Sequence, residues 1–114
     1  MGVEQIENLG ATKDRFDCID LTENEIGRLE NFPKLYRLAT LMLANNRIAR
    51  IADGFGLMVP NLAALNMSGN RLSTLSDLLP LARLKKVSML SLLSNAVTKR
   101  PNYRAFVINM LPSL

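Results

Sequence analysis

The side chains best suited to catalysis or metal binding are scarce in this chain. It has no histidine and a single cysteine, Cys18, and its ten acidic residues form no group with the spacing of metal ligands. Nucleophile–base pairs and most transition-metal sites depend on these residue types. The sequence also contains no glycine-rich phosphate-binding motif. We therefore predict that the chain is not an enzyme and needs no cofactor, metal or small-molecule substrate.

Asparagine is the residue whose spacing is regular. Asn24, Asn46, Asn70 and Asn95 each occupy the ninth position of the pattern L-x-x-L-x-L-x-x-N-x-L, with steps of 22, 24 and 25 residues between them. Repeats of about 20 to 29 residues with this pattern are typical of leucine-rich repeats. The pattern predicts a single α/β solenoid domain over 1–114. Its expected parts are repeats near 16–37, 38–61, 62–86 and 87–100 and a C-terminal helical cap over 101–114.

The centre of each copy alternates apolar and variable residues, which indicates a strand with one buried face. Stacked copies therefore predict a short parallel sheet on the concave side of the solenoid. Each asparagine follows its strand where the chain turns into the core. Its amide is expected to bond backbone groups that the turn leaves unpaired, so we interpret the four asparagines as a structural ladder.

The segments between the copies are expected to return along the convex side as short helices or 3₁₀ turns. Pro33 argues against a long helix in the first return segment, 27–37. In the second, the glycines within 53–56 predict a loose loop ahead of the helical turn. The third, 72–84, places an apolar residue at every third position, which fits a short helix or a 3₁₀ turn.

Function in a solenoid is usually carried by the variable residues that project from the concave sheet. Here those positions include two acids and no lysine or arginine, which disfavours nucleic-acid binding by this face. Small side chains flank three large apolar ones, which suits close approach by a helix of another protein. A face that is simply solvated is the alternative. The predicted partner-binding residues are Asp20, Thr22, Glu23, Met42, Asn45, Asn66, Met89, Ser91 and Leu93.

Positive charge gathers just after the asparagines instead. Arg47 and Arg71 directly follow the second and third asparagine, and Lys99 and Arg100 extend this edge beyond the fourth repeat. The net charge of +4 is modest for a dedicated nucleic-acid-binding protein. Two interpretations stay open for these four residues. They contact an RNA backbone beside a partner that recognises the bases, or they form a solvated edge.

The composition also bears on the compartment. No apolar run is long enough to span a membrane, and the first seven residues lack the basic and apolar parts of a secretory signal. A single cysteine cannot form an internal disulfide, which favours a reducing compartment. We expect no membrane association.

Two segments resemble a known group of proteins. Residues 95–114 resemble the cap motif N-P-V-T-x(4)-Y-R-x-Y-V-I-x-x-L-P-x-L of certain intracellular leucine-rich repeat proteins, with Ala96 in place of the proline. The block from Ile6 to Ile26 resembles the A-prime family of the spliceosomal U-2 small nuclear ribonucleoprotein (snRNP). The similarity continues through Phe32–Pro33 and 45–48 and covers nearly the whole chain.

This resemblance implies a nuclear, non-enzymatic protein of pre-mRNA splicing. In the A-prime family the concave face holds an RNA-recognition-motif protein of the B-double-prime type, and the pair binds a stem-loop of the U-2 small nuclear RNA. For this chain the resemblance implies such a partner on the concave residues, and U-2 RNA bound only together with that partner. A regulatory scaffold for a phosphatase or an axonemal dynein subunit is the alternative, because such proteins share the short repeats and the cap.

Overall fold

The structure is a computed structural model that describes residues 17–114. Phe16, which was expected to open the first repeat, and the part of the Ile6–Ile26 block before it lie outside the described residues.

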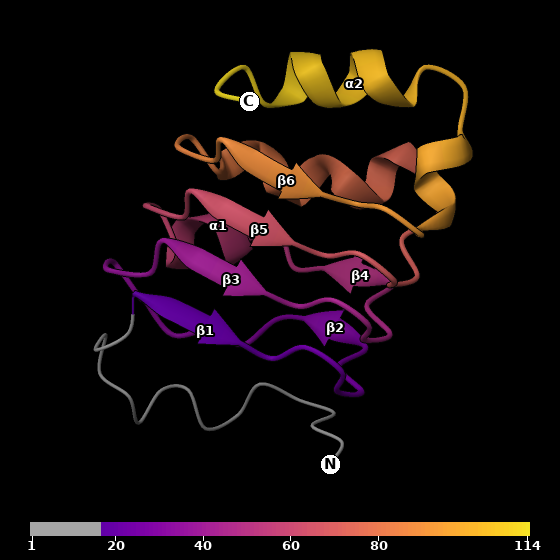
Figure 1. Cartoon of the computed structure of the whole chain (residues 1–114). Coiled ribbons are helices and arrows are strands. Elements are labelled where there is room, and N and C mark those ends of the chain that lie inside the picture. Colours follow the sequence, from indigo (N-terminus) through magenta and orange to yellow (C-terminus); the bar gives the residue numbers. More distant parts are fainter. Residues whose placement is uncertain (1–16) are drawn as a thin grey trace.

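A four-stranded parallel sheet forms one side of the solenoid (Figure 1). In sheet order its strands are β1 (Cys18–Asp20), β3 (Thr40–Met42), β5 (Ala64–Asn66) and β6 (Met89–Ser91). Corresponding motif positions pair across the sheet, so that Ile19, Leu41, Leu65 and Leu90 form one inward row. The first three of these side chains are buried and Leu90 is half-buried. The predicted sheet and its inward face are therefore confirmed.

The asparagines join each turn to the repeat before it. Asn70 is buried; its Oδ1 accepts a hydrogen bond of 2.9 Å from the Ile48 amide, and its Nδ2 donates to the carbonyls of Leu43 and Met67, each at 2.9 Å. The side chains of Asn46 and Asn95 are also buried and make the corresponding bonds to their own and the preceding repeat. Half-buried Asn24 donates to the Leu21 carbonyl at 2.8 Å.

The second and third return segments are helical, as predicted, but the second differs in detail. Asp53 and Gly54 form a turn ahead of helix α1 (Phe55–Met58), but the helix begins inside the glycine-rich stretch, so the loop is shorter than expected. A glycine is needed at position 56 within the helix, because a Cβ there would lie 2.7 Å from the Cβ of Arg83. The third segment is a 3₁₀ helix, η2 (Leu75–Arg83), that packs against α1.

The first return segment is neither a helix nor a 3₁₀ turn, so that expectation was wrong for this repeat. Pro33 lacks an amide hydrogen, and Asn31 adopts a positive φ of 59°, so the chain cannot wind continuously here. It stays largely extended, and the Leu35 amide donates to the Met58 carbonyl at 2.8 Å. Sequence reasoning also missed a second, two-stranded parallel sheet of β2 (Arg28–Leu29) and β4 (Arg50–Ile51).

The core lies between the sheet and the return segments and is closed at one end by the cap (Figure 1). Phe32 and Phe55 meet edge to face within it, with ring centroids 5.3 Å apart. A short 3₁₀ helix, η3 (Ala96–Lys99), leads to the cap helix α2 (Tyr103–Met110). Val107 and Leu111 are buried from the cap side. In the described range, no helix has the length and apolarity to cross a membrane.

Candidate functional site

The concave face exposes large apolar side chains at its cap end. Met89 and Leu93 have exposed fractions of 69% and 71%. Met42, the last residue of β3, is half-buried. Exposure of this kind on a continuous face is characteristic of a surface that another molecule covers.

Several of the predicted partner-binding residues surround one groove of about 590 Å³ on this face, here called the sheet groove. Its walls are largely apolar and come from three strands and the chain's last residue. The described residues that line it are Thr40, Leu41, Met42, Ala64, Leu65, Asn66, Ser88, Met89, Leu90, Ser91 and Leu114. Asp20, Thr22, Glu23 and Asn45 were predicted to belong to the same face but lie outside the groove.

A second hollow, of about 720 Å³, lies between β6 and the cap and is called the cap hollow. Leu93 forms part of its apolar floor, and Leu90 and Ser91 line both hollows, which makes the two continuous. Polar groups come from the cap side: Thr98, Arg100, Asn102, Tyr103 and Arg104. Burial raises the pKa of the Tyr103 hydroxyl, against the opposing charge of Arg104, so it is a neutral hydrogen-bond donor at pH 7.

Asp20 and Asn66, which occupy equivalent outward positions of β1 and β5, accept hydrogen bonds from backbone amides of their own repeats. The Asp20 carboxylate accepts a 2.9 Å bond from the Thr22 amide, and Asn66 Oδ1 accepts one of 3.0 Å from the Ser68 amide. The hydroxyl and amide of Thr22 hold the pKa of Asp20 below its ordinary value. The Ser68 hydroxyl lies 2.7 Å from Asn66 Oδ1 and 2.7 Å from the Ser91 hydroxyl. These bonds fix which side-chain atoms the face presents.

The residue before each asparagine has a left-handed backbone. Glu23, Asn45, Gly69 and Ser94 have φ values of 61°, 58°, 69° and 60°. Such values are unfavourable for most side chains, and asparagine and glycine tolerate them best. A Cβ at Gly69 would also collide with Oδ1 of Asn45 in the adjacent repeat. The Asn45 and Gly69 types are therefore explained by the turn, independently of any partner.

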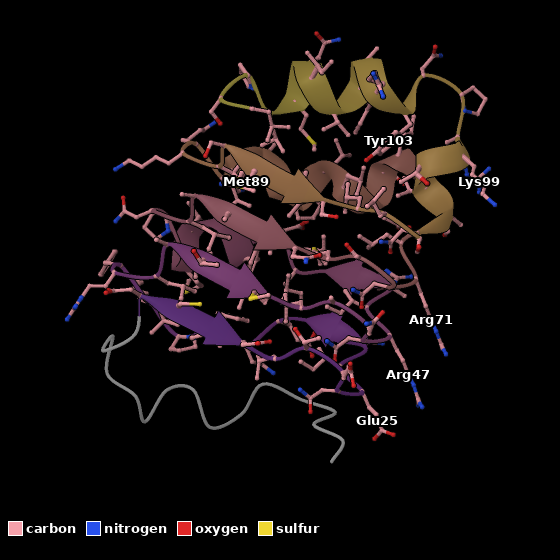
Figure 2. The ribbon with its side chains drawn as sticks, viewed as in Figure 1. Glu25, Arg47, Arg71, Met89, Lys99 and Tyr103 are labelled. Atoms are coloured by element: carbon pink, nitrogen blue, oxygen red, sulfur yellow. The ribbon has the colours of Figure 1, made fainter. Side chains whose placement is uncertain are left out.

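Three of the four predicted RNA-backbone residues lie along one edge of the solenoid. Figure 2 shows Arg47, Arg71 and Lys99 projecting there, with Glu25 beside Arg47. Arg47 forms an exposed ion pair of 3.6 Å with Glu25, whereas Arg71 has no acidic residue within ion-pair distance in the part of the chain described. Arg100 differs, because its Nε donates to the Ser73 carbonyl at 2.7 Å and its side chain lines the cap hollow.

The second sheet adds a further pair of cations, Arg28 and Arg50, of which sequence reasoning missed Arg28. Arg28 and Arg50 are exposed and lie side by side in the β2–β4 sheet. Their signal was present in the sequence, because Arg28, Arg50 and Lys99 all stand four residues after a motif asparagine. We call the group Arg28, Arg47, Arg50, Arg71 and Lys99 the basic edge.

The described residues contain no group of three histidine, cysteine or acidic side chains that could hold a metal ion. The arrangement offers surfaces for binding instead: an apolar groove, a polar hollow with two arginines, and a separate basic edge.

A leucine-rich repeat family model matches residues 1–114. The chain belongs to this leucine-rich repeat family.

Curated relatives with similar sequences share the name U2 small nuclear ribonucleoprotein A′. The chain is 54% identical to the U2 small nuclear ribonucleoprotein A′ of Arabidopsis thaliana over 96% of its own length and 44% of the relative's. It is 50% identical to the protein of the same name from Homo sapiens, over 96% of its length and 43% of the relative's. The chain thus spans less than half the length of these relatives.

A solved member of the family has nearly the same backbone. A chain in the crystal structure of the Drosophila melanogaster SNF/U2A′ complex matches 99% of this chain with a TM-score of 0.94 and 50% identity. The match covers 66% of that chain. The backbone that resembles this one so closely was therefore solved as part of a complex.

Of the predicted partner-binding residues, the sheet groove brings together Met42, Asn66, Met89 and Ser91, and Leu93 lines the cap hollow. Several lining residues that sequence reasoning did not indicate lie where the repeat pattern ends. Leu114 in the sheet groove and Tyr103 and Arg104 in the cap hollow come from the cap, whose placement over the face is not contained in the repeat. Ser68 is absent from the predicted partner-binding residues, because it acts through hydrogen bonds to neighbouring side chains, which its residue type alone does not indicate.

Proposed function

We propose that this chain is a non-enzymatic protein-binding module of the U2 snRNP that acts in pre-mRNA splicing in the nucleus. Its concave face holds an RNA-recognition-motif protein of the B-double-prime type. The single observation that carries this proposal is the 0.94 TM-score match to a chain of the SNF/U2A′ complex. The A′ names of the curated relatives support it.

The chemistry of the concave face fits a protein partner better than RNA. The outward positions of the four repeats contain no cation to neutralise phosphates and no aromatic ring to stack on bases. Covering Met89 and Leu93 would remove from water two side chains that are 69% and 71% exposed. Full burial of a side chain of this size stabilises by about 1.5 to 3 kcal/mol, which makes these residues strong candidates for binding hot spots.

The basic edge offers a surface for contact with the RNA backbone, and this contact depends on a partner that recognises the bases. Its cations are spaced along the stack rather than gathered in a pocket, so they suit contacts to successive phosphates and carry no base recognition. The edge therefore adds affinity for U2 RNA once the partner has recognised the bases. Arg47, Arg71 and Lys99 are the residues proposed for this contact.

The test is capture of the partner by substituted chains from nuclear extract, with and without ribonuclease. Met42→Glu and Leu93→Glu place a charge in the contact and should each reduce capture of the RNA-recognition-motif protein by about 100-fold or more. Leu79→Glu is the matched control, since Leu79 has an exposed fraction of 54% and lies on η2. U2 RNA should be lost on digestion while the protein partner remains.

Normal capture by both folded concave-face variants would refute the concave-face model. Recovery of a phosphatase or dynein subunit without RNA would favour a regulatory scaffold instead.

A further inference from the structure

The strands of the four-stranded sheet begin on the side of the molecule opposite β2 and β4 (Figure 1). The last residues of three successive return segments lie on this side, because each segment leads into the next strand of the sheet. These stretches are 33–37 ahead of β3, 56–61 ahead of β5 and 82–86 ahead of β6. The side is separate from the basic edge, which follows the ends of the strands.

Hydrogen bonds join the three stretches in order. The Leu35 amide donates to the Met58 carbonyl at 2.8 Å, and Asn61 Nδ2 donates to the Tyr36 carbonyl at 2.7 Å. The same Asn61 side chain accepts at its Oδ1 a bond of 2.7 Å from the Lys86 ammonium. The three stretches therefore form one continuous surface, which we call the strand-start surface.

The strand-start surface is strongly basic. Its three stretches contain no acidic residue and five exposed cations, out of 14 in the whole chain: Lys34, Arg37, Arg83, Lys85 and Lys86. Asp17 pairs with Arg37 at 3.3 Å, but both side chains are largely exposed, so water screens this ion pair. The surface therefore attracts anionic groups.

Two large side chains with apolar bodies are exposed among these cations. Tyr36 and Leu57 have exposed fractions of 51% and 54%. Each is adjacent in sequence to one partner of the hydrogen bond between Leu35 and Met58, so both belong to the same part of the surface. Met58 itself is half-buried. Tyrosine, methionine and arginine are the residue types enriched where proteins bind one another.

A nucleic acid would use only part of this chemistry. Its phosphates would pair with the cations and one base would stack on Tyr36, but Leu57 and Met58 would have no role. An acidic peptide with a large apolar side chain uses the cations and the apolar residues together. The combination of positive charge and exposed apolar surface therefore favours a peptide.

We propose that the strand-start surface binds an acidic peptide segment of another protein that carries a large apolar anchor. Carboxylates of the peptide pair with Lys34, Arg83 and Lys86, and the anchor packs on Tyr36 and Leu57. These residues line neither the sheet groove nor the cap hollow. The inference thus adds a second protein-binding surface and goes beyond the proposed function.

The first test compares two labelled peptides of about ten residues by fluorescence anisotropy with the full chain. One carries glutamates on both sides of a central leucine and phenylalanine, and the other has glutamine in place of each glutamate. We expect the acidic peptide to bind at least about tenfold more tightly at low salt, with an advantage that shrinks as salt screens the charges. Equal affinities would overturn the proposal.

Charge reversal locates the site. Lys34→Glu combined with Arg83→Glu changes two exposed cations that form no ion pair in the described part of the chain, and should weaken the acidic peptide by about tenfold or more. Arg50→Glu combined with Arg71→Glu is the matched control, because it makes the same change in net charge on the basic edge. It should weaken binding by less than about threefold. Equal losses would assign the attraction to net charge alone and overturn the proposal.

Removal of the apolar contact tests the anchor. Leu57→Ser should weaken the acidic peptide by about threefold to tenfold at both low and high salt, because burial of apolar surface is not screened. Leu79→Ser is the matched control, since Leu79 has the same exposed fraction of 54% but lies on η2 outside the strand-start surface. Equal affinities of the two variants would overturn the anchor and with it the proposal.

Two further measurements separate this surface from RNA binding and from the proposed function. A labelled single-stranded oligonucleotide of about ten nucleotides should bind independently of Lys34→Glu and Arg83→Glu; an oligonucleotide that loses affinity while the peptide does not bind would identify a nucleic-acid site instead. Capture of the RNA-recognition-motif partner should be unchanged in the same double variant. Loss of that capture would assign the surface to the same partner and overturn a second site.

Discussion

The concave face and the basic edge lie on opposite sides of the same asparagine turn, yet their chemistry differs completely. Ser68 belongs to the concave face and Arg71 to the basic edge, with only Gly69 and buried Asn70 between them. The sheet groove of the face is largely apolar with a few fixed polar atoms, whereas the edge repeats a cation in successive turns. Adjacent positions of one motif can thus present an apolar surface and a charged one, because the turn directs them to different sides of the molecule.

Removing the buried side-chain amide of Asn70 should destabilise the concave face and the basic edge together, and this change has the largest expected effect. Asn70→Ala leaves the Ile48 amide and the carbonyls of Leu43 and Met67 without their partner. Unsatisfied buried groups cost about 1 to 3 kcal/mol each, so we expect the free energy of unfolding to fall by about 3 kcal/mol or more. Urea denaturation measures it.

Asn24→Ala is the comparison for that loss. Asn24 is half-buried in the first described repeat, so its replacement should cost about 1 kcal/mol. Equal losses for the two variants would show that the ladder does not depend on burial.

Gly69, whose backbone is left-handed, lies between the concave face and the basic edge, and Gly69→Ala tests its role in the turn. The φ of 69° and the collision of a Cβ with Asn45 Oδ1 should lower the free energy of unfolding by about 1 to 3 kcal/mol. Gly54→Ala is the matched control, because Gly54 has a φ of −85° and an added Cβ there would meet no other heavy atom within 4 Å. Thermal denaturation of both should separate them; a neutral Gly69→Ala would mean that the turn adapts.

Acid should destabilise the fold through Asp77, which lies at the start of η2. Burial opposes the charge of this carboxylate, but bonds from Thr74 and Ser73 outweigh it and leave its pKa below the ordinary value. A lowered folded pKa means that the stabilisation is complete above the unfolded pKa, about 4, and is lost as the pH falls through the folded pKa.

Asp77→Asn should therefore lower stability at pH 7 by about 1 kcal/mol, the usual value of a helix-start contact. The difference from the parent chain should shrink as the pH falls from about 5 toward about 2, measured by urea unfolding at each pH. A difference that stays constant with pH would exclude the carboxylate as the cause.

How far the sequence predicted these regions depends on whether a feature repeats. The motif predicted the sheet register and the rows that face outward, because apolar alternation and the asparagine recur in every copy. It did not predict the extended first return segment, which Pro33 and the left-handed Asn31 impose on one repeat alone. Leu114 and Arg104 reach the candidate site from the cap, so their position depends on tertiary packing that no periodic pattern encodes.

The smallest expected effect concerns the basic edge and would sharpen its separation from the face. Arg71→Glu should weaken U2 RNA binding by the protein–partner complex by about threefold to tenfold and reduce the slope of log affinity against log salt by about one. Arg47→Glu should do less, since Arg47 already shares its charge with Glu25 at 3.6 Å. Capture of the protein partner should be unchanged in both variants, because neither residue lines the sheet groove or the cap hollow. An RNA affinity and salt slope that do not change would assign the edge to solvent, whereas loss of the protein partner would show that the two regions act as one.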